Sequence, residues 1–136
     1  MTLTKAIILD LDNVLFDSRV LDLYMPTDKN SREQWTEFEQ HYVKVTNNQW
    51  AVDLVNMYRR DGYTILFVTS REDINNCRGV TLNSIYSALN GDLNFVWLFM
   101  RHTGDFSPSP DVKKDIYLNE IKDNFEIGRA SCRERV

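Results

Sequence analysis

Three runs of apolar residues recur along the chain, at residues 5–11 (KAIILDL), 63–69 (YTILFVT) and 94–100 (NFVWLFM). A strand with one face in water alternates apolar and polar residues, whereas a strand covered on both faces is apolar throughout. Each run has the length of a strand and is too short for an average helix. We therefore predict three buried strands at these positions.

Between and after these runs, apolar residues recur at helical spacing. The three sets are Trp50, Ala51, Leu54, Val55 and Tyr58; Val80, Ile85, Tyr86 and Leu89; and Val112, Ile116, Tyr117 and Ile121. Gly62 and Gly91 follow the first two sets, where a helix would end. Ser109 precedes the third set and is suited to be its N-cap, with Pro110 at the first helical position. Three helices are expected.

Strands that alternate with helices predict an α/β fold in which a parallel sheet carries helices on both faces. In such sheets, ligands bind just beyond the carboxyl ends of the strands. Asp10, Asp12, residues 69–71 (TSR) and Arg101 all lie at that end of a predicted strand. We expect three separate segments to bring polar side chains to one rim of the sheet.

Residues 18–47 fit this alternation least well, because they are mostly polar and aromatic. We expect a short helix at about residues 32–45 and interpret the segment as a small cap or lid over the rim. A plain connecting helix is the alternative, and the pattern alone does not separate the two. The expected organisation is a single domain over residues 1–127 with this insertion.

Composition narrows the class of protein. The 136 residues carry a net charge of −4 and are 43% hydrophobic, as expected for one soluble domain. Neither a transmembrane run nor a signal peptide is recognisable, so we expect a cytoplasmic protein. The charge argues against non-specific coating of nucleic acid but permits a local basic cluster that grips one phosphate. Cys77 and Cys132 lie far apart and are expected to be free thiols.

Asp10 and Asp12 place two carboxylates at the end of a buried strand, which is costly unless something compensates their charge. Mg²⁺ prefers oxygen ligands and suits one or two carboxylates plus a phosphate. One carboxylate could then attack phosphorus, while the other protonates the leaving oxygen and later activates water. Two surface aspartates in a loop would produce the same short pattern, so the pair alone does not decide.

Residues at the other predicted strand ends favour phosphate chemistry. Thr69, Ser70 and Arg71 supply hydroxyl groups and a guanidinium, which are good phosphate donors. Lys113, at the start of the last predicted helix, can neutralise developing negative charge. Each residue alone has an ordinary structural explanation. An acidic pair, a hydroxyl and a lysine in this order at successive strand ends together favour a phosphate site.

The segments DLDNV (10–14), ILFVTSRE (65–72) and PDVKKDIY (110–117) resemble the haloacid dehalogenase superfamily of phosphotransferases. Within it, the chain is most similar to the 3′-phosphatase domain of phage-type polynucleotide kinase/phosphatase. The resemblance spans about residues 5–127 and implies the three-layer, Rossmann-like fold of that superfamily. The sequence departs from the pattern at residues 13–14, Asn-Val, where the superfamily more often has Gly-Thr.

The resemblance implies roles for the residues of the rim. Asp10 would be the nucleophile that forms an aspartyl-phosphate, and Asp12 the general acid and base. Thr69 would hydrogen-bond the phosphoryl oxygens, and Lys113 would steady the nucleophile and the phosphate. Lys114 is the neighbouring alternative. Lys113 is preferred because the V-K-x-x-I-[FY] spacing of the family places the lysine there.

The same resemblance implies a substrate-binding set and a metal. Arg71 and Arg101 match positions that contact substrate phosphate, and Ser70 lies beside the first of them. Asp10 and Asp12 would hold Mg²⁺.

The activity that these residues favour is Mg²⁺-dependent hydrolysis of phosphate monoesters, with the 3′-phosphate of a nucleic-acid end as the expected substrate. A small-molecule or nucleotide phosphatase is a second possibility. A phospho-accepting receiver domain and a module that only binds phosphate ends are alternatives of another class. Receiver domains usually place their acidic residues on separate strands, so two acids at one strand end favour the phosphatase. No Walker-type loop is present, so no 5′-kinase activity is expected.

Residues 128–136 (GRASCRERV) contain no apolar run and no aspartate. In the family that the chain resembles, a further strand follows the position of residues 125–127 and carries an acidic pair that holds the metal. We therefore interpret residues 128–136 as a foreign tail and expect the C-terminal strand to be missing, which would leave the first strand without its neighbour. A genuine, divergent C-terminus is the alternative.

If the tail is foreign, the chain as written is expected to be weakly active or inactive, because the metal loses an acidic partner. Adding a strand that carries Asp-Asp after residue 127 is expected to restore hydrolysis of a phosphate monoester. Phosphatase assays of the two proteins check this expectation, and no recovery of activity would count against it.

Overall fold

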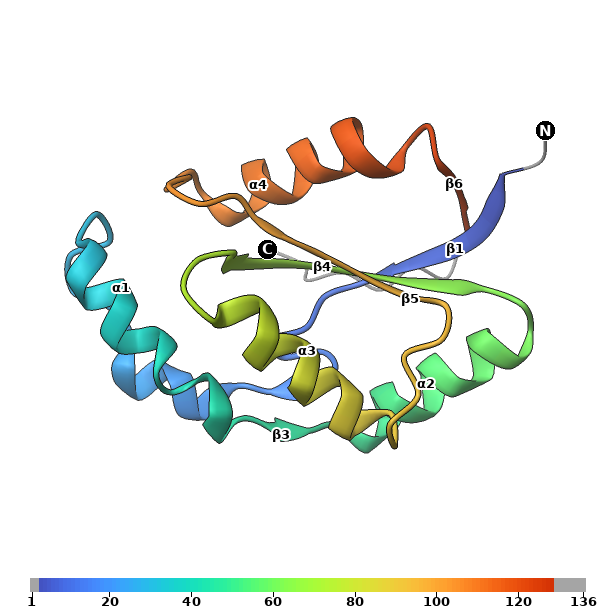
Figure 1. Cartoon of the computed structure of the whole chain (residues 1–136), viewed down its shortest axis with the longest axis horizontal. Helices are drawn as coiled ribbons and strands as arrows, with labels where there is room; N and C mark the ends of the chain where they lie inside the picture. Colours follow the sequence, from blue (N-terminus) through green and yellow to red (C-terminus); the bar gives the residue numbers. More distant parts are fainter. Residues whose placement is uncertain (1–2, 129–136) are drawn as a thin grey trace.

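The structure is a computed structural model and describes residues 3–128. Its centre is a parallel sheet with four strands, in the spatial order β5 (Val96–Arg101), β4 (Thr64–Glu72), β1 (Thr4–Leu9) and β6 (Phe125–Ile127). Helices α2 (Gln49–Arg60) and α3 (Cys77–Ala88) cover one face of the sheet, and α4 (Ser109–Ile116) covers the other (Figure 1). The predicted three-layer α/β fold is confirmed.

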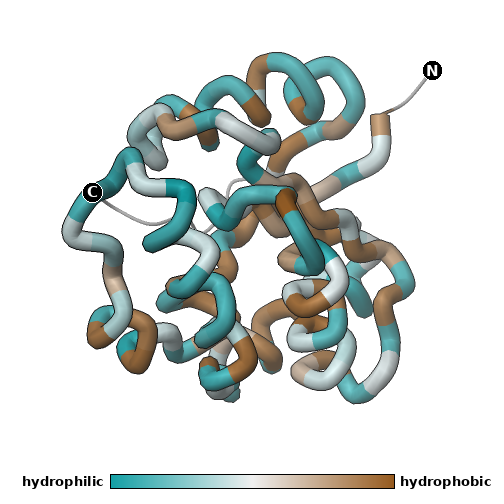
Figure 2. Tube along the Cα trace, turned by 60° about the vertical axis from the view of Figure 1, so that its left-hand side comes forward, coloured by the Kyte–Doolittle hydropathy of each residue, from teal (hydrophilic) through white to brown (hydrophobic). Residues whose placement is uncertain are grey.

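Alternate residues of β1 and β4 face the two helical layers. Ile7, Leu9, Ile65 and Phe67 pack with α2 and α3, whereas Ala6, Leu66 and Val68 pack with α4. In Figure 2, brown (hydrophobic) stretches gather in the middle of the molecule, and teal (hydrophilic) residues are frequent in the segments around them. Because both faces of these strands are buried, neither face needs polar residues, and the sequence runs are apolar throughout.

The helices begin and end close to the predicted positions. Gly62 follows α2 with a φ of +90°, a conformation that glycine adopts without steric cost. Pro108, not Ser109, is the N-cap of α4, so Pro110 occupies the second helical position. After Ile116, the helix continues as a π-helical turn, η3 (Tyr117–Ile121).

Segment 18–47 folds as one short helix between two 3₁₀ turns. These elements are η1 (Arg19–Tyr24), α1 (Arg32–Glu39) and η2 (Tyr42–Lys44). The expected helix is therefore present but ends at Glu39. Two short antiparallel strands, β2 (Phe16–Asp17) and β3 (Thr46–Asn47), hold the ends of the segment side by side. The segment lies beyond the carboxyl ends of the strands (Figure 1).

Strand β6 corrects the expectation that the first strand is left without a neighbour. Residues 125–127 pair in parallel with residues 4–6 of β1, and the Gly128 N–H donates to the carbonyl oxygen of Ala6 over 2.8 Å. Three residues are too few to show the apolar pattern by which a strand is recognised. The rest of the tail, residues 129–136, lies outside the described residues. Among the described helices, none has the length and apolar character needed to cross a membrane.

The packing of α4 against the sheet generates a stability prediction. Ile116 is 2% exposed and Leu118, two positions later, is 43% exposed. Ile116→Ala is expected to lower the free energy of unfolding by about 2–5 kcal/mol, because it leaves a cavity between α4 and the sheet. Leu118→Ala is the matched control and is expected to change it by about 0.5 kcal/mol. Urea denaturation measures both, and equal losses would contradict the packing described.

Candidate active site

Asp10 and Lys113 form an ion pair at the end of β1. Asp10 continues the alternation of Ala6 and Ile8, which face the layer of α4. The Lys113 ammonium on α4 donates to Asp10 Oδ2 over 2.6 Å, and the Leu11 N–H donates to Oδ1 over 2.8 Å. The Asp10 side chain is 5% exposed. A buried carboxylate is thus held by a cation from a helix that lies more than a hundred residues further along the chain.

Asp12 faces a different cation. The guanidinium of Arg71 donates to both of its carboxylate oxygens, over 2.9 Å from Nε and 2.7 Å from Nη2. The Ser18 hydroxyl donates to Oδ1 over 2.6 Å. A planar guanidinium that pairs with a carboxylate in this two-point way fixes the orientation of the carboxylate as well as its charge. The two aspartates, although only two residues apart, therefore pair with different cations.

The turn after Leu11 separates the two carboxylates. Asn13 adopts a φ of +64°, in the left-handed region that asparagine tolerates better than most residues. The Val14 and Phe16 N–H groups both donate to the Leu11 carbonyl oxygen. Glycine would suit this conformation equally well. The departure from Gly at position 13 is thus compatible with the turn.

Arg71 is buried almost completely, with 2% of its side chain exposed. Its Nη1 donates to Thr81 Oγ1 over 3.2 Å, and its guanidinium carbon lies 4.0 Å from the centre of the Tyr42 ring. Burial acts to lower the pKa of Arg71, but the hydrogen bonds and the charge of Asp12 outweigh it and hold this pKa above its usual value. A phosphate contact by Arg71 stays a prediction, since its guanidinium faces Asp12 here.

Thr69 and Arg101 organise the ends of β4 and β5. The Thr69 hydroxyl oxygen accepts from the Arg71 N–H over 3.1 Å and is buried. Arg101 donates to the carbonyl oxygens of Ser70, Asp105 and Ser107, over 2.8, 2.9 and 2.6 Å. Its guanidinium thereby fixes the loop of residues 102–108 against the end of β4.

A cavity of about 520 Å³ lies between segment 18–47 and this rim. Its lining comes from the rim (Asp12, Ser70, Arg71, Glu72 and Arg101), from the segment (Leu21, Met25, Lys29, Trp35 and Tyr42), from the loop (residues 106–108) and from the start of α4 (Ser109). Ligand pockets are commonly of this size. Asp10, Thr69 and Lys113 are not part of this lining. Asp10 and Lys113 thus form an ion pair on the α4 side of the sheet. The second group of predicted residues, which faces the cavity, is Asp12, Ser70, Arg71 and Arg101.

Pattern reasoning missed several residues of the site. Ser18, Tyr42 and Thr81 all contact Asp12 or Arg71, but they come from segment 18–47 and α3 and share no motif. Among the two lysines considered, Lys113 contacts Asp10, whereas Lys114 is exposed. A signal for Ser18 was its nearness in the sequence to Asp12, six residues earlier.

The described cysteine and the acidic residues bear on thiol and metal chemistry. Burial raises the pKa of the Cys77 thiol to about 12, which makes it a poor nucleophile. Cys132 lies outside the described residues. Within residues 3–128, no group of three or more histidine, cysteine, aspartate or glutamate side chains is placed to hold a metal ion. Asp10 and Asp12 are the two carboxylates at the end of β1.

Comparison with solved structures agrees with this fold. A structure of a Pnkp1/Rnl/Hen1 complex contains a chain that matches with a TM-score of 0.64 and 24% identity, over 93% of this chain and 38% of that one. A structure of the Pnkp1/Rnl/Hen1 RNA repair complex matches with the same TM-score and identity, over 92% and 34%. This chain thus spans little more than a third of either.

Comparison with family models identifies the chain more closely. No curated protein sequence matched it significantly. The model of the polynucleotide kinase PNKP phosphatase domain, of haloacid dehalogenase type, matches residues 4–131, nearly the whole chain. The match includes both groups of rim residues described above. The chain therefore belongs to the PNKP phosphatase domain family and is a phosphatase, a phosphoric monoester hydrolase.

Proposed function

We propose that the chain hydrolyses 3′-phosphates at nucleic-acid ends, with Mg²⁺ and through an aspartyl-phosphate on Asp10. The observation that carries this proposal is the 2.6 Å contact between Lys113 and Asp10, beside an Asp12 that a different cation holds. Two neighbouring carboxylates with separate partners suit the two roles that the reaction requires.

In the first step, an Asp10 oxygen attacks phosphorus, and the bond between phosphorus and the leaving oxygen breaks. Asp12 gives its proton to the leaving oxygen, which departs as an alcohol. Lys113 holds Asp10 in position and offsets the negative charge that gathers around the phosphoryl group. The burial of Asp10 supports its role as the nucleophile, because a carboxylate with little water around it is a stronger nucleophile.

In the second step, water attacks phosphorus of the aspartyl-phosphate, and Asp12 accepts a proton from that water. Asp10 is released together with inorganic phosphate. The two-point contact of Arg71 with Asp12 holds the ionised carboxylate, which is the form that accepts this proton. Thr69 would donate to a phosphoryl oxygen, and Arg101 with Ser70 would contact substrate phosphate from the cavity side.

The residues present fit Mg²⁺, which prefers oxygen ligands and requires few of them from protein when a phosphate supplies others. Asp10 and Asp12 would hold it. The ion would supply positive charge to the phosphoryl oxygens when bound.

Segment 18–47 would act as a small cap of the single domain 1–127. Its residues form one wall of the cavity, opposite Asp12 and Arg101. A wall of this kind excludes water from the reacting groups and contacts the part of the substrate beyond the phosphate. Trp35 and Phe106 in the lining are suited to contact a nucleobase, because aromatic rings stack on bases.

The RNA repair complex among the structural neighbours supports a nucleic-acid end as the substrate. A nucleotide phosphatase is the second candidate, favoured by the cavity of about 520 Å³, which is large enough for one nucleotide. Membership of a phosphatase family argues against the receiver domain and the binding module as alternatives.

Asp10→Asn is expected to abolish hydrolysis of an aryl phosphate in the presence of Mg²⁺, because the amide cannot form the covalent intermediate. Asp111→Asn, on the exposed first turn of α4, is the control and is expected to retain activity. Steady-state assays with and without Mg²⁺ provide the measurement. Retained activity in Asp10→Asn would exclude the aspartyl-phosphate.

The substrate class is tested by competition between three phosphate esters. An oligonucleotide with a 3′-phosphate is expected to have a kcat/KM about tenfold or more above that of a nucleoside 3′-monophosphate, because additional contacts bind the chain next to the phosphate. The same oligonucleotide with a 5′-phosphate is the control and should be a poor substrate. A preference for the mononucleotide would favour the nucleotide phosphatase instead.

A further inference from the structure

Glu72, the last residue of β4, joins three segments around the cavity. Its Oε1 and Oε2 accept from the two terminal nitrogens of Arg32, over 2.6 and 2.7 Å. Its Oε2 also accepts from the Gly104 N–H over 2.7 Å. Glu72 is 8% exposed, so this carboxylate connects α1, β4 and the loop of residues 102–108 from inside the molecule. We call Glu72, Arg32 and Gly104 the Glu72 cluster.

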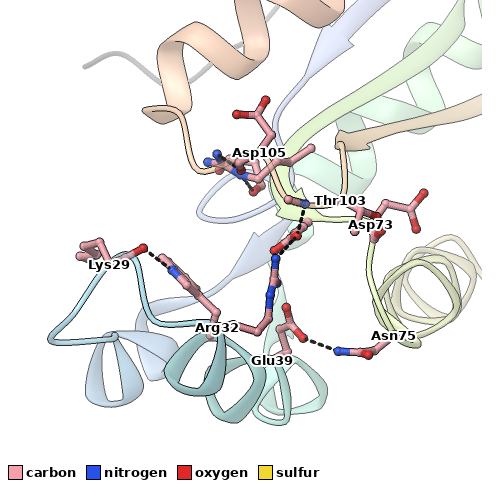
Figure 3. Close-up of polar contacts among 12 residues, drawn as sticks. Lys29, Arg32, Glu39, Asp73, Asn75, Thr103 and Asp105 are labelled. Atoms are coloured by element: carbon pink, nitrogen blue, oxygen red, sulfur yellow. Dashed lines mark hydrogen bonds and ion pairs between the residues drawn. The ribbon is translucent and has the colours of Figure 1, made fainter.

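Arg32 is the first residue of α1, and its side chain extends from the helix toward the end of β4 (Figure 3). Its guanidinium also lies 4.9 Å from the centre of the Phe106 ring, in the same loop as Gly104. The other end of α1 is linked to the turn between β4 and α3 by Glu39, which accepts from Asn75 over 3.4 Å. Both ends of the helix are therefore attached to the strand-end side of the cavity.

The charges of the cluster are maintained in this setting. Burial acts to raise the pKa of Glu72, but the hydrogen bonds from Arg32 and from the Gly104 N–H outweigh it and lower this pKa below its usual value. The carboxylate is therefore ionised at neutral pH, and its two-point contact with Arg32 stays in place.

We propose that Glu72 is a positioning residue, which holds α1 and the loop of residues 102–108 in the arrangement that binds the part of a large substrate beyond its phosphate. This inference rests on the proposed function, in which segment 18–47 contacts the substrate. The hydrogen bonds of the cluster join α1 to the loop of residues 102–108, and Glu72 lines the cavity beside Arg101. Loss of the cluster therefore affects binding of a large substrate more than the chemistry at Asp10. A small substrate that needs only the phosphate site depends on it less.

The test compares Glu72→Gln and Arg32→Gln on two substrates. For a 3′-phosphorylated oligonucleotide, KM is expected to rise about tenfold or more while kcat changes by less than about threefold. For an aryl phosphate, kcat/KM is expected to change by less than about threefold. Arg32→Lys, which retains the charge but loses the two-point geometry, is expected to restore part of the loss. The double variant should be no worse than either single variant, because both remove one interaction.

Arg78→Gln is the matched control, because it removes an exposed ion pair with Asp73 near the same rim. It should leave both substrates unaffected. Equal losses of kcat/KM on both substrates in Glu72→Gln would overturn the proposal, because they would indicate a general structural or catalytic role.

Hydrogen exchange tests the arrangement independently of activity. In Glu72→Gln, the amides of residues 32–39 are expected to exchange about tenfold faster, because α1 opens locally, while those of α2 are unchanged. Unchanged exchange in residues 32–39 would overturn the proposal even if the chain hydrolysed oligonucleotides. Faster exchange in a chain that hydrolyses no phosphate would support the positioning role and count against the proposed function alone.

Discussion

The ion pair between the buried guanidinium of Arg71 and the carboxylate of Asp12 is the interaction on which the arrangement of the rim depends. A charge removed from water must be paired and hydrogen-bonded, and removing one partner of such a pair costs about 3–5 kcal/mol. Its partners come from distant parts of the chain: Asp12 after β1, Thr81 on α3 and Tyr42 in segment 18–47. The Arg71 side chain therefore sets both the orientation of Asp12 and the position of that segment on the rim.

Local patterns were sufficient to predict three of the four strands of the sheet and the place of Asp10 at a strand end. Continuous apolar runs indicated β1, β4 and β5, because burial on both faces leaves a direct trace in composition. The family resemblance was needed to choose Lys113 over Lys114 as the partner of Asp10. The geometry of the fold explains why the lysine reaches Asp10. Asp10 lies at a strand end on the side of α4, and the first turns of that helix reach the same rim.

Tertiary contacts decided what the pattern could not predict. Nothing in the sequence around Arg71 indicates that Tyr42 and Thr81 contact it. Residues 125–127 form a strand only because β1 offers them an edge. Glu72 adjoins a recognised motif, yet its role depends on Arg32, forty positions earlier. Each of these features is set by a partner that lies far away in the chain.

The paired strands β2 and β3 have a consequence for how such enzymes diversify. They place Asp17 opposite Thr46, so the excursion between them leaves the core and returns to it at a single point. Doubling the length of a loop with fixed ends costs only about 0.6 kcal/mol of chain entropy. The length of the segment can therefore change at little cost, provided that Ser18 and Tyr42, which contact Asp12 and Arg71, are retained.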